Sequence, residues 1–114
     1  MIFQVTVSGH GDNKMMTVQG GCVGSDISEA GAPHGAFAIS GNAGTVGQGS
    51  QLMAGWGQLS RSCGFAIDNI VRYKICDANG EIKTLSASEN QDLFWAFRGA
   101  GWAFGVLLEY LGWW

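Results

Sequence analysis

Charged residues are scarce in this sequence, and basic residues are the scarcest. Charged side chains make up 13% of the 114 residues, and six lysines and arginines stand against nine acidic residues, for a net charge of −3. Globular proteins usually carry about twice this charged share. Binding to nucleic acid through phosphates requires clustered basic side chains, and the sequence has no such cluster. We therefore expect no nucleic-acid partner.

Long apolar runs and grouped metal-binding residues are also missing. No apolar run approaches the ~18 residues of a membrane-spanning helix, so we expect no membrane segment. Cys22, Cys63 and Cys76 show no C-x-x-C spacing. The two histidines, His10 and His34, lie far from any cysteine pair. This pattern predicts no metal site, and it favours small buried cysteines over a single disulfide.

The N-terminal residues show no targeting pattern. Residues 1–7 contain no basic n-region and no cleavage-like site, so we predict no signal peptide. They begin inside an alternating strand pattern instead. This start leads us to expect that upstream sequence is missing.

Glycine and aromatic residues are abundant. The chain has 19 glycines, five tryptophans and six phenylalanines, and 46% of its residues are hydrophobic. This glycine share is about twice the usual one, while the hydrophobic share is ordinary and allows a core. With so few charges, the chain should expose apolar surface that suits a ligand, a second domain or another subunit.

Residues 86–109 organise the chain. Ser88 followed by Gln91 predicts a capping box, and Phe94 and Phe97 lie on one apolar face of the helix that would follow. Gly99 should end this helix, because glycine reaches left-handed backbone angles at little cost. Residues 106–108 then form a short apolar run that is typical of a buried strand.

Alternating patterns predict two hairpins. Residues 3–7 and 15–19 flank one turn, and residues 70–76 and 81–85 flank Asn79-Gly80, the strongest hairpin signal in the chain. Apolar spacing predicts helices at residues 24–32, 56–63 and 89–97. We expect an α+β fold in which these hairpins and a third strand form a small mixed sheet with the helices packed on it.

Residues 41–57, GNAGTVGQGSQLMAGWG, form a second informative stretch. Glycines at this density let backbone N–H groups approach a ligand closely, and a diphosphate is a natural guest. The stretch is not a dinucleotide-binding fingerprint, because Leu52 stands where the third glycine is needed. It is not a P-loop, because no Gly-Lys-Ser/Thr is present. From the residues alone, both a phosphate-binding loop and a flexible linker stay open.

Several segments resemble one flavoprotein family. Residues 89–106, ENQDLFWAFRGAGWAFGV, resemble the E-N-x-D-L-F-W-A-x-R-G-x-G-x-x-F-G-V segment of FAD-linked oxidases. Residues 64–69, GFAIDN, resemble the Y-G-L-x-x-D-N segment of this family, and residues 18–21 resemble its V-x-G-G segment. The family is that of vanillyl-alcohol oxidase and p-cresol methylhydroxylase, and the resemblance is strongest to its berberine-bridge-enzyme-like branch.

The resemblance implies FAD as a cofactor and names the residues around it. Residues 45–49 would lie along the diphosphate and the flavin ring, and residues 55–57 would make the next contact. The 99–105 loop and the residue after it would face the adenine end. The implied cofactor-binding residues are Thr45, Val46, Gly47, Gly49, Gly55, Gly57, Gly101, Gly105 and Val106.

The glycine stretch also departs from the family pattern. Gln48 or Ser50 replaces the second glycine of a pair, and the family's triple glycine is Met53-Ala54-Gly55 here. Side chains are therefore expected where cofactor atoms would press against bare backbone. The cysteine that attaches flavin in some members would fall near residues 42–43, which are Asn and Ala, so that link is absent.

Three titratable residues invite a catalytic interpretation. His10, in Ser-Gly-His-Gly, is superficially similar to the family's flavin-linking histidine, but a solvated turn is favoured. His34 is expected to be structural. Asp68 is expected to cap or turn the chain, because no second titratable group accompanies it. The sequence therefore assigns no catalytic residue.

Two functional hypotheses follow. The first is an FAD-dependent oxidoreductase that passes a hydride from a small-molecule substrate to FAD, present as a fragment without the flavin-linking subdomain and the substrate domain. The second is a non-catalytic remnant or interaction module without flavin. Residues 1–109 would form the partial FAD-binding domain, and residues 110–114 an atypical tail that does not continue the strand.

Overall fold

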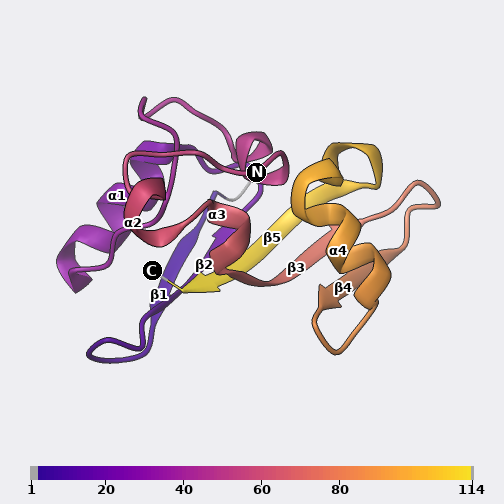
Figure 1. Ribbon diagram of the computed structural model, residues 1–114, viewed down its shortest axis with the longest axis horizontal. Helices are drawn as coiled ribbons and strands as arrows, with labels where there is room; N and C mark the ends of the chain where they lie inside the picture. The colour runs from indigo at the N-terminus through magenta and orange to yellow at the C-terminus, as the bar shows by residue number, and fades with distance from the viewer. Residues whose placement is uncertain (1–2, 114) are drawn as a thin grey trace.

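A computed structural model describes residues 3–113, which form one sheet with helices packed on it (Figure 1). The strands are β1 (Val5–Ser8), β2 (Met15–Gln19), β3 (Ile70–Cys76), β4 (Ile82–Ser86) and β5 (Val106–Trp113). The helices are α1 (Gly24–Gly31), α2 (Ser60–Cys63), α3 (Ala66–Asn69) and α4 (Gln91–Ala100), with 3-10 turns η1 (Ala32–His34), η2 (Gln48–Leu52) and η3 (Gly101–Ala103). The predicted α+β class is confirmed.

The five strands are ordered β1-β2-β5-β3-β4, and all four pairings are antiparallel. The expected mixed sheet is therefore an antiparallel one. Both predicted hairpins are present, and Gly80 has the positive φ of +80° that the tight turn requires. Local turn chemistry was sufficient to identify them.

Strand β5 is longer than the sequence indicated. The expectation that no strand continues beyond Glu109 is wrong, because β5 runs to Trp113. Tyr110 pairs with Val18 of β2 and with Tyr73 of β3, so this part of β5 lies in the middle of the sheet. The division of the chain at residue 109 stays a prediction.

Helix α4 differs from its prediction at the start and agrees at the end. The Ser88 capping box is wrong, because the residue at the N-cap is Asn90, and the Ser88 hydroxyl instead lies 3.3 Å from that of Ser86. Gly99 has a φ of +137° and interrupts the helical geometry, as expected. Phe94 and Phe97 are buried on the predicted face.

Helix α1 agrees with its prediction, and α2 is shorter than predicted. Helix α1 matches the predicted 24–32 segment closely, and the Asp26 carboxylate accepts the Val23 N–H at its start over 2.8 Å. The predicted 56–63 helix is wrong in its first half, because α2 begins at Ser60. Gly57 N–H donates to the Ser60 hydroxyl there, so a turn precedes the helix. None of the helices in residues 3–113 is long and apolar enough to cross a bilayer.

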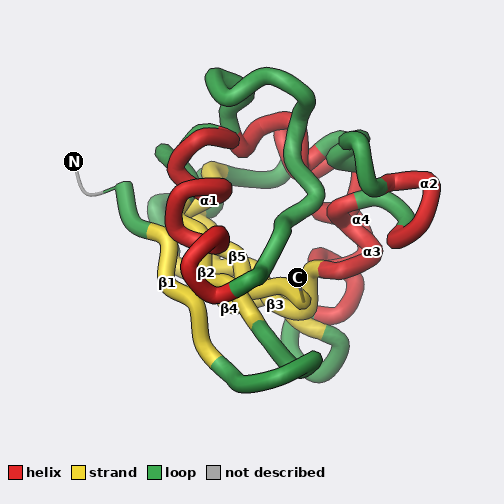
Figure 2. The backbone as a smooth tube through the Cα atoms, turned by 90° about the vertical axis from the view of Figure 1, so that its left-hand side faces the viewer, coloured by secondary structure: helices red, strands yellow, loops and turns green. Residues whose placement is uncertain are grey.

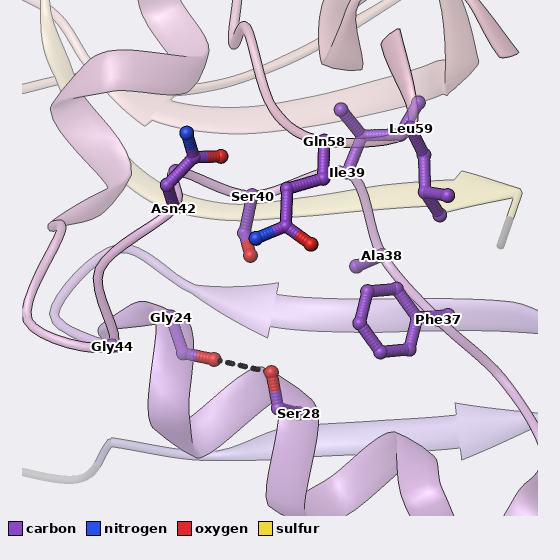
Figure 3. A pocket seen from close by; sticks show the side chains of 11 residues that line it. Gly24, Ser28, Phe37, Ala38, Ile39, Ser40, Asn42, Gly44, Gln58 and Leu59 are labelled. Carbon is purple, nitrogen blue, oxygen red and sulfur yellow. Dashed lines mark hydrogen bonds between the residues drawn. The ribbon is translucent and has the colours of Figure 1, made fainter. Parts of the chain in front are cut away.

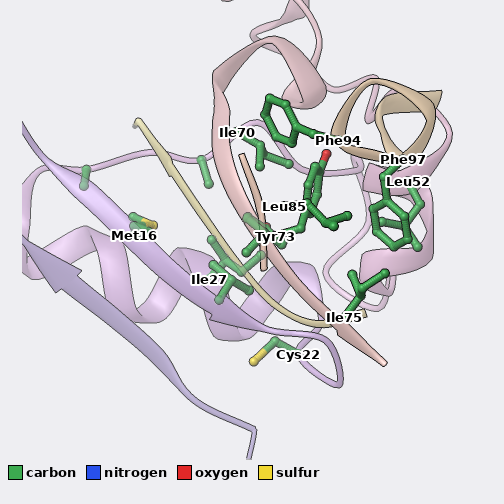
Figure 4. Close-up of a cluster of buried hydrophobic side chains, with 14 residues drawn as sticks. Met16, Cys22, Ile27, Leu52, Ile70, Tyr73, Ile75, Leu85, Phe94 and Phe97 are labelled. Atoms are coloured by element: carbon green, nitrogen blue, oxygen red, sulfur yellow. The ribbon is translucent and has the colours of Figure 1, made fainter. Parts of the chain in front are cut away.

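The core lies between the sheet and the helices, which gather above and to one side of the strands in Figure 2. Tyr73 is at its centre, with its ring centroid 5.0 Å from that of Phe97 and 5.8 Å from that of Phe94 (Figure 4). Ile27 of α1 and Leu52 of η2 belong to the same buried cluster. The core therefore connects the 41–57 glycine stretch to both the sheet and α4.

Candidate functional site

The glycine stretch is attached to the start of α1. The Gly24 N–H donates to the Val46 carbonyl over 3.0 Å, and the Ser25 N–H donates to the Gly44 carbonyl over 2.9 Å. Gly47 also pairs with Val23. Residues 44–47 are therefore fixed along the entry to a helix and do not form a free linker.

Gly47 and Gly49 present open backbone. A Cβ atom added at either position would meet no heavy atom within 4 Å. Neither residue has a positive φ, and Gly47 is extended with φ −77° and ψ 166°. Contacts and backbone angles within the chain thus give no reason for glycine at these two positions.

Packing within the chain restricts the other candidate glycines to different degrees. A Cβ at Gly55 would overlap the Gln51 carboxamide and Ala66, and one at Gly57 would overlap the Ser40 carbonyl. At Gly101 a Cβ would lie 3.1 Å from Leu52 Cβ.

Gly105 and Val106 lie where β5 begins. A Cβ at Gly105 would come within 2.7 Å of the Cys76 carbonyl oxygen on β3. Val106 pairs with Cys76, and its side chain is exposed. The η2 segment packs beside η3, which precedes these residues. The structure therefore brings the 45–57 and 101–106 residues onto neighbouring segments.

Gln48 points into the protein. Its side chain is 2% exposed, its Nε2 donates to the Cys22 carbonyl over 3.1 Å, and its Oε1 accepts the Tyr110 hydroxyl over 2.9 Å. The expectation that the Gln48 side chain stands in the way of a cofactor is therefore wrong. Ser50, the other departure in this register, donates its hydroxyl to the Gly47 carbonyl over 3.1 Å.

Gln51 is a second buried glutamine beneath the stretch. It is 1% exposed, and its Nε2 donates to the Ile39 carbonyl over 3.2 Å. Its Oε1 is buried without a hydrogen-bond partner among residues 3–113. The burial of these two glutamines was not predicted from the sequence, although their three-residue spacing is the repeat that places side chains on one face of a 3-10 turn.

Tyr110, which donates to Gln48, and its cross-strand neighbour Tyr73 are both buried in the core. Burial raises the pKa of Tyr110 above its ordinary value, with smaller contributions from Tyr73 and Cys22. Burial likewise raises the pKa of Tyr73, against a smaller opposing effect of Arg98. Both hydroxyls therefore stay neutral to a higher pH than an exposed tyrosine would. No local pattern in the sequence indicates Tyr110, because its place in the sheet depends on β2 and β3, which are distant in sequence.

Ala54 adopts backbone angles that favour glycine. Its φ is +150°, and it occupies the middle of the Met53-Ala54-Gly55 triplet. The chain therefore keeps a glycine-like conformation with an alanine in place.

A small hollow lies beside the glycine stretch. It has a volume of about 110 Å³ and lies between Ser28 on α1, the 37–44 segment and Gln58 (Figure 3). Ser40 and Asn42 contribute polar atoms to its wall. The hollow is too small for a dinucleotide, and it is adjacent to the exposed 41–44 backbone.

The titratable residues near these segments have structural partners or lie on the surface. The Asp68 carboxylate accepts the Phe65 N–H over 2.8 Å, which agrees with the predicted capping role. Its Oδ1 also lies 3.8 Å from Nη2 of Arg98. His10 and His34 are exposed. No group of three or more metal-ligating side chains is present in residues 3–113.

Comparison with known proteins identifies the family. The model of the FAD binding domain matches residues 4–86. The FAD-linked oxidoreductase pgmH of Aspergillus terreus is 39% identical over 102 residues, which are 87% of this chain and 21% of the relative.

Solved structures agree with this match. The 6-hydroxy-D-nicotine oxidase of Arthrobacter nicotinovorans superposes with a TM-score of 0.89 at 32% identity, over 96% of this chain and 24% of that one. The BBE-like 1 protein of Physcomitrella patens superposes with a TM-score of 0.85 at 31% identity, over 95% of this chain and 24% of that one. The chain thus spans about a quarter or less of the length of these relatives. It belongs to the FAD-binding domain family of the FAD-linked oxidoreductases, whose cofactor is FAD.

Proposed function

We propose that this chain is the cofactor-binding part of a longer FAD-dependent oxidoreductase. In this proposal the backbone of residues 45–49 holds the diphosphate and the adjoining flavin ring, with Thr45, Val46, Gly47 and Gly49 as the contacts. The complete protein would add a flavin-linking subdomain and a substrate domain. This chain covers about a quarter or less of its relatives, which supports the assignment of the remaining functions to other parts of the complete protein.

The open backbone at Gly47 and Gly49 carries the proposal. A glycine that no contact and no backbone angle of the chain requires is expected where another molecule presses against the main chain. Because Gln48 points inward, its side chain leaves this surface clear. The residues present therefore fit a diphosphate that lies along the loop.

The remaining candidate residues contribute in a different way. Gly55, Gly57, Gly101 and Gly105 let the segments around the loop pack closely, so we assign them the role of shaping the cofactor surface. Val106 is exposed at the start of β5 and would offer an apolar contact to the adenine.

The chemistry is divided between cofactor and protein. Bound FAD supplies a hydride acceptor for the oxidation of a small organic substrate. The residues of this chain bind and orient the cofactor, and we assign no catalytic acid or base among residues 3–113. The substrate-facing groups would come from the complete protein.

A flavin titration tests the proposal. We expect FAD to bind saturably, measured as quenching of flavin fluorescence, and we expect Gly47→Leu and Gly49→Leu to weaken binding at least tenfold. The added side chains meet no atom of the chain, so the unfolding free energy should change little. Ala87→Leu, which adds bulk at an exposed turn after β4, is the control.

The contrary result would favour the non-catalytic alternative. A site with a favourable binding free energy of roughly 5–6 kcal/mol is half occupied at about 100 μM ligand. Absence of binding at that FAD concentration would overturn the proposal. An interaction module would then be supported by Trp95 and Trp102, whose side chains are 80% and 70% exposed around η3 and α4.

A further inference from the structure

From Gly47 to Gly49, the residues at the start of η2 alternate between the surface and the core. Gly47 and Gly49 are exposed, whereas Gln48 between them is buried. Gln51 follows at the three-residue spacing that aligns side chains on a 3-10 turn, and it is buried too. One side of this segment is thus bare backbone, and the other side carries two buried carboxamides.

The buried carboxamides connect this segment to three other parts of the chain. Gln48 reaches the Cys22 carbonyl between β2 and α1, and also the Tyr110 hydroxyl in β5. Gln51 reaches the Ile39 carbonyl. Apart from the pairing of Gly47 with Val23, these are the hydrogen bonds that join residues 47–52 to distant elements in the described part of the chain.

The bond to Tyr110 differs from the others because it ends on a side chain in the middle of the sheet. Tyr110 is 1% exposed and pairs with both neighbouring strands, so its hydroxyl is a rigid point of attachment. A buried carboxamide oxygen without this donor would carry a desolvation cost. The segment would relieve that cost by moving its glutamine toward water, and the flanking glycines would move with it.

We propose that Tyr110 is a positioning residue for the cofactor: through Gln48, it holds the backbone of Gly47 and Gly49 in the orientation that receives the FAD diphosphate. This inference rests on the proposed function. It assigns a binding role to β5 residue Tyr110, which does not itself need to touch FAD.

The chain offers a matched control for this role. Tyr73 is the cross-strand neighbour of Tyr110 and is equally buried, yet its hydroxyl has no hydrogen-bond partner within residues 3–113. Replacing either tyrosine by phenylalanine removes one buried hydroxyl from the same core. Only the Tyr110 change removes the donor to Gln48.

The experiment compares Tyr110→Phe and Tyr73→Phe in the 114-residue chain. We expect Tyr110→Phe to weaken FAD binding roughly five- to tenfold, the factor that one net hydrogen bond provides. Tyr73→Phe should bind FAD within twofold of the unmodified chain. Flavin fluorescence titration gives both dissociation constants.

Amide hydrogen exchange without ligand separates positioning from general stability. Tyr110→Phe should accelerate exchange selectively at residues 47–52 relative to β3 and β4. A merely structural role would accelerate exchange throughout the sheet. If Tyr110→Phe does not fold, Gln48→Met breaks the same bond from the loop side, together with the bond to the Cys22 carbonyl, and should also accelerate exchange selectively at residues 47–52.

The outcomes distinguish this inference from the proposed function. If the unmodified chain does not bind FAD, both are overturned. If it binds FAD and Tyr110→Phe binds as tightly as Tyr73→Phe, this inference alone is overturned. Uniform acceleration of exchange would also overturn it, even with weakened FAD binding.

Discussion

The glycines of the 41–57 stretch fall into two kinds: those that packing within the chain requires, and those that only contact with a ligand would explain. Gly55 and Gly57 cannot carry a side chain without overlapping their neighbours, whereas Gly47 and Gly49 could. Ala54 is the opposite case, since it carries a side chain where the backbone angle favours glycine. The methyl group of Ala54 therefore places strain beside a segment that is otherwise free of it.

Ala54→Gly should relieve this strain. A residue held in a sparsely populated backbone region lowers the unfolding free energy by about 1–3 kcal/mol. Glycine has greater freedom in the unfolded chain, which offsets about 0.4–1 kcal/mol of the gain from relieving this strain. We expect a net stabilisation of about 1 kcal/mol, measured by urea denaturation. Ala87→Gly makes the same chemical change at an exposed residue without a positive φ and should destabilise the chain. Equal destabilisation by both changes would contradict the strain.

The candidate site could be predicted from the sequence only in outline. Glycine density located the stretch, but it could not say which glycines face outward, because that depends on neighbours such as Ser40 and Ala66. The inward direction of Gln48 could not be predicted, because its hydrogen-bond partner lies 62 positions away in β5. Contacts of that range leave no pattern in a single sequence.

At the scale of elements, the β3–β4 hairpin is held by a compact set of local bonds. The Asp77 carboxylate accepts the N–H groups of Asn79 and Glu81 over 2.9 and 3.0 Å, and it lies 2.6 Å from the Lys83 ammonium. The hydrogen bond from Lys83, followed by the Glu81 N–H, lowers the pKa of Asp77 below its ordinary value. The charged form of Asp77 is therefore the form that the fold favours.

Acid should weaken this hairpin in a way that depends on Asp77. Because the folded-state pKa is lowered, the contribution of Asp77 is present above the ordinary carboxyl pKa of about 4 and is lost as pH falls through the lower folded-state value. Asp77→Asn keeps an oxygen acceptor for the turn and removes the titration. We expect its unfolding free energy to fall less between pH 6 and pH 2 than that of the unmodified chain. If urea denaturation shows that the unfolding free energies of the variant and the unmodified chain fall equally between pH 6 and pH 2, this expectation is ruled out.

Elements defined by local chemistry were predicted well, and those defined by distant contacts were not. Asn79-Gly80 specifies its own turn, and the Phe94 and Phe97 face follows from helical spacing. The N-cap of α4 was predicted wrongly because Asn90 donates its side-chain N–H to the Thr84 carbonyl of β4 over 2.7 Å, which fixes the helix start from outside. Strand β5 was predicted too short because its last residues are held by β2 and β3.

At the scale of the whole molecule, one exposed apolar surface lies along α4 and η3. A groove of about 510 Å³ is lined by Trp95, Phe104 and Ile67, and Trp102 is exposed on the adjacent η3. Arg98, whose guanidinium carbon lies 5.4 Å from the Phe94 ring centroid, is the charged residue in this lining. Such a surface is typical of a face that another protein segment covers.

The isolated chain should self-associate through this face. We expect sedimentation velocity to show reversible oligomers at tens of micromolar protein, because few charges oppose contact between the aromatic surfaces. The double change Trp95→Lys and Trp102→Lys should restore a monomer. Trp56→Lys, at an exposed tryptophan outside the groove, is the control and should leave the oligomers unchanged. A monomeric unmodified chain would contradict this expectation.

The position of β5 between β2 and β3 also determines the order in which the sheet can assemble. Each hairpin can form by itself from contacts close in sequence, but the two can join only through β5, which follows both hairpins in the sequence. That step closes loops of many residues, so it carries most of the chain-entropy cost and should limit the rate of folding. The residues that complete the sheet, Tyr110 among them, are then also the ones that convert two marginal hairpins into a cooperative unit.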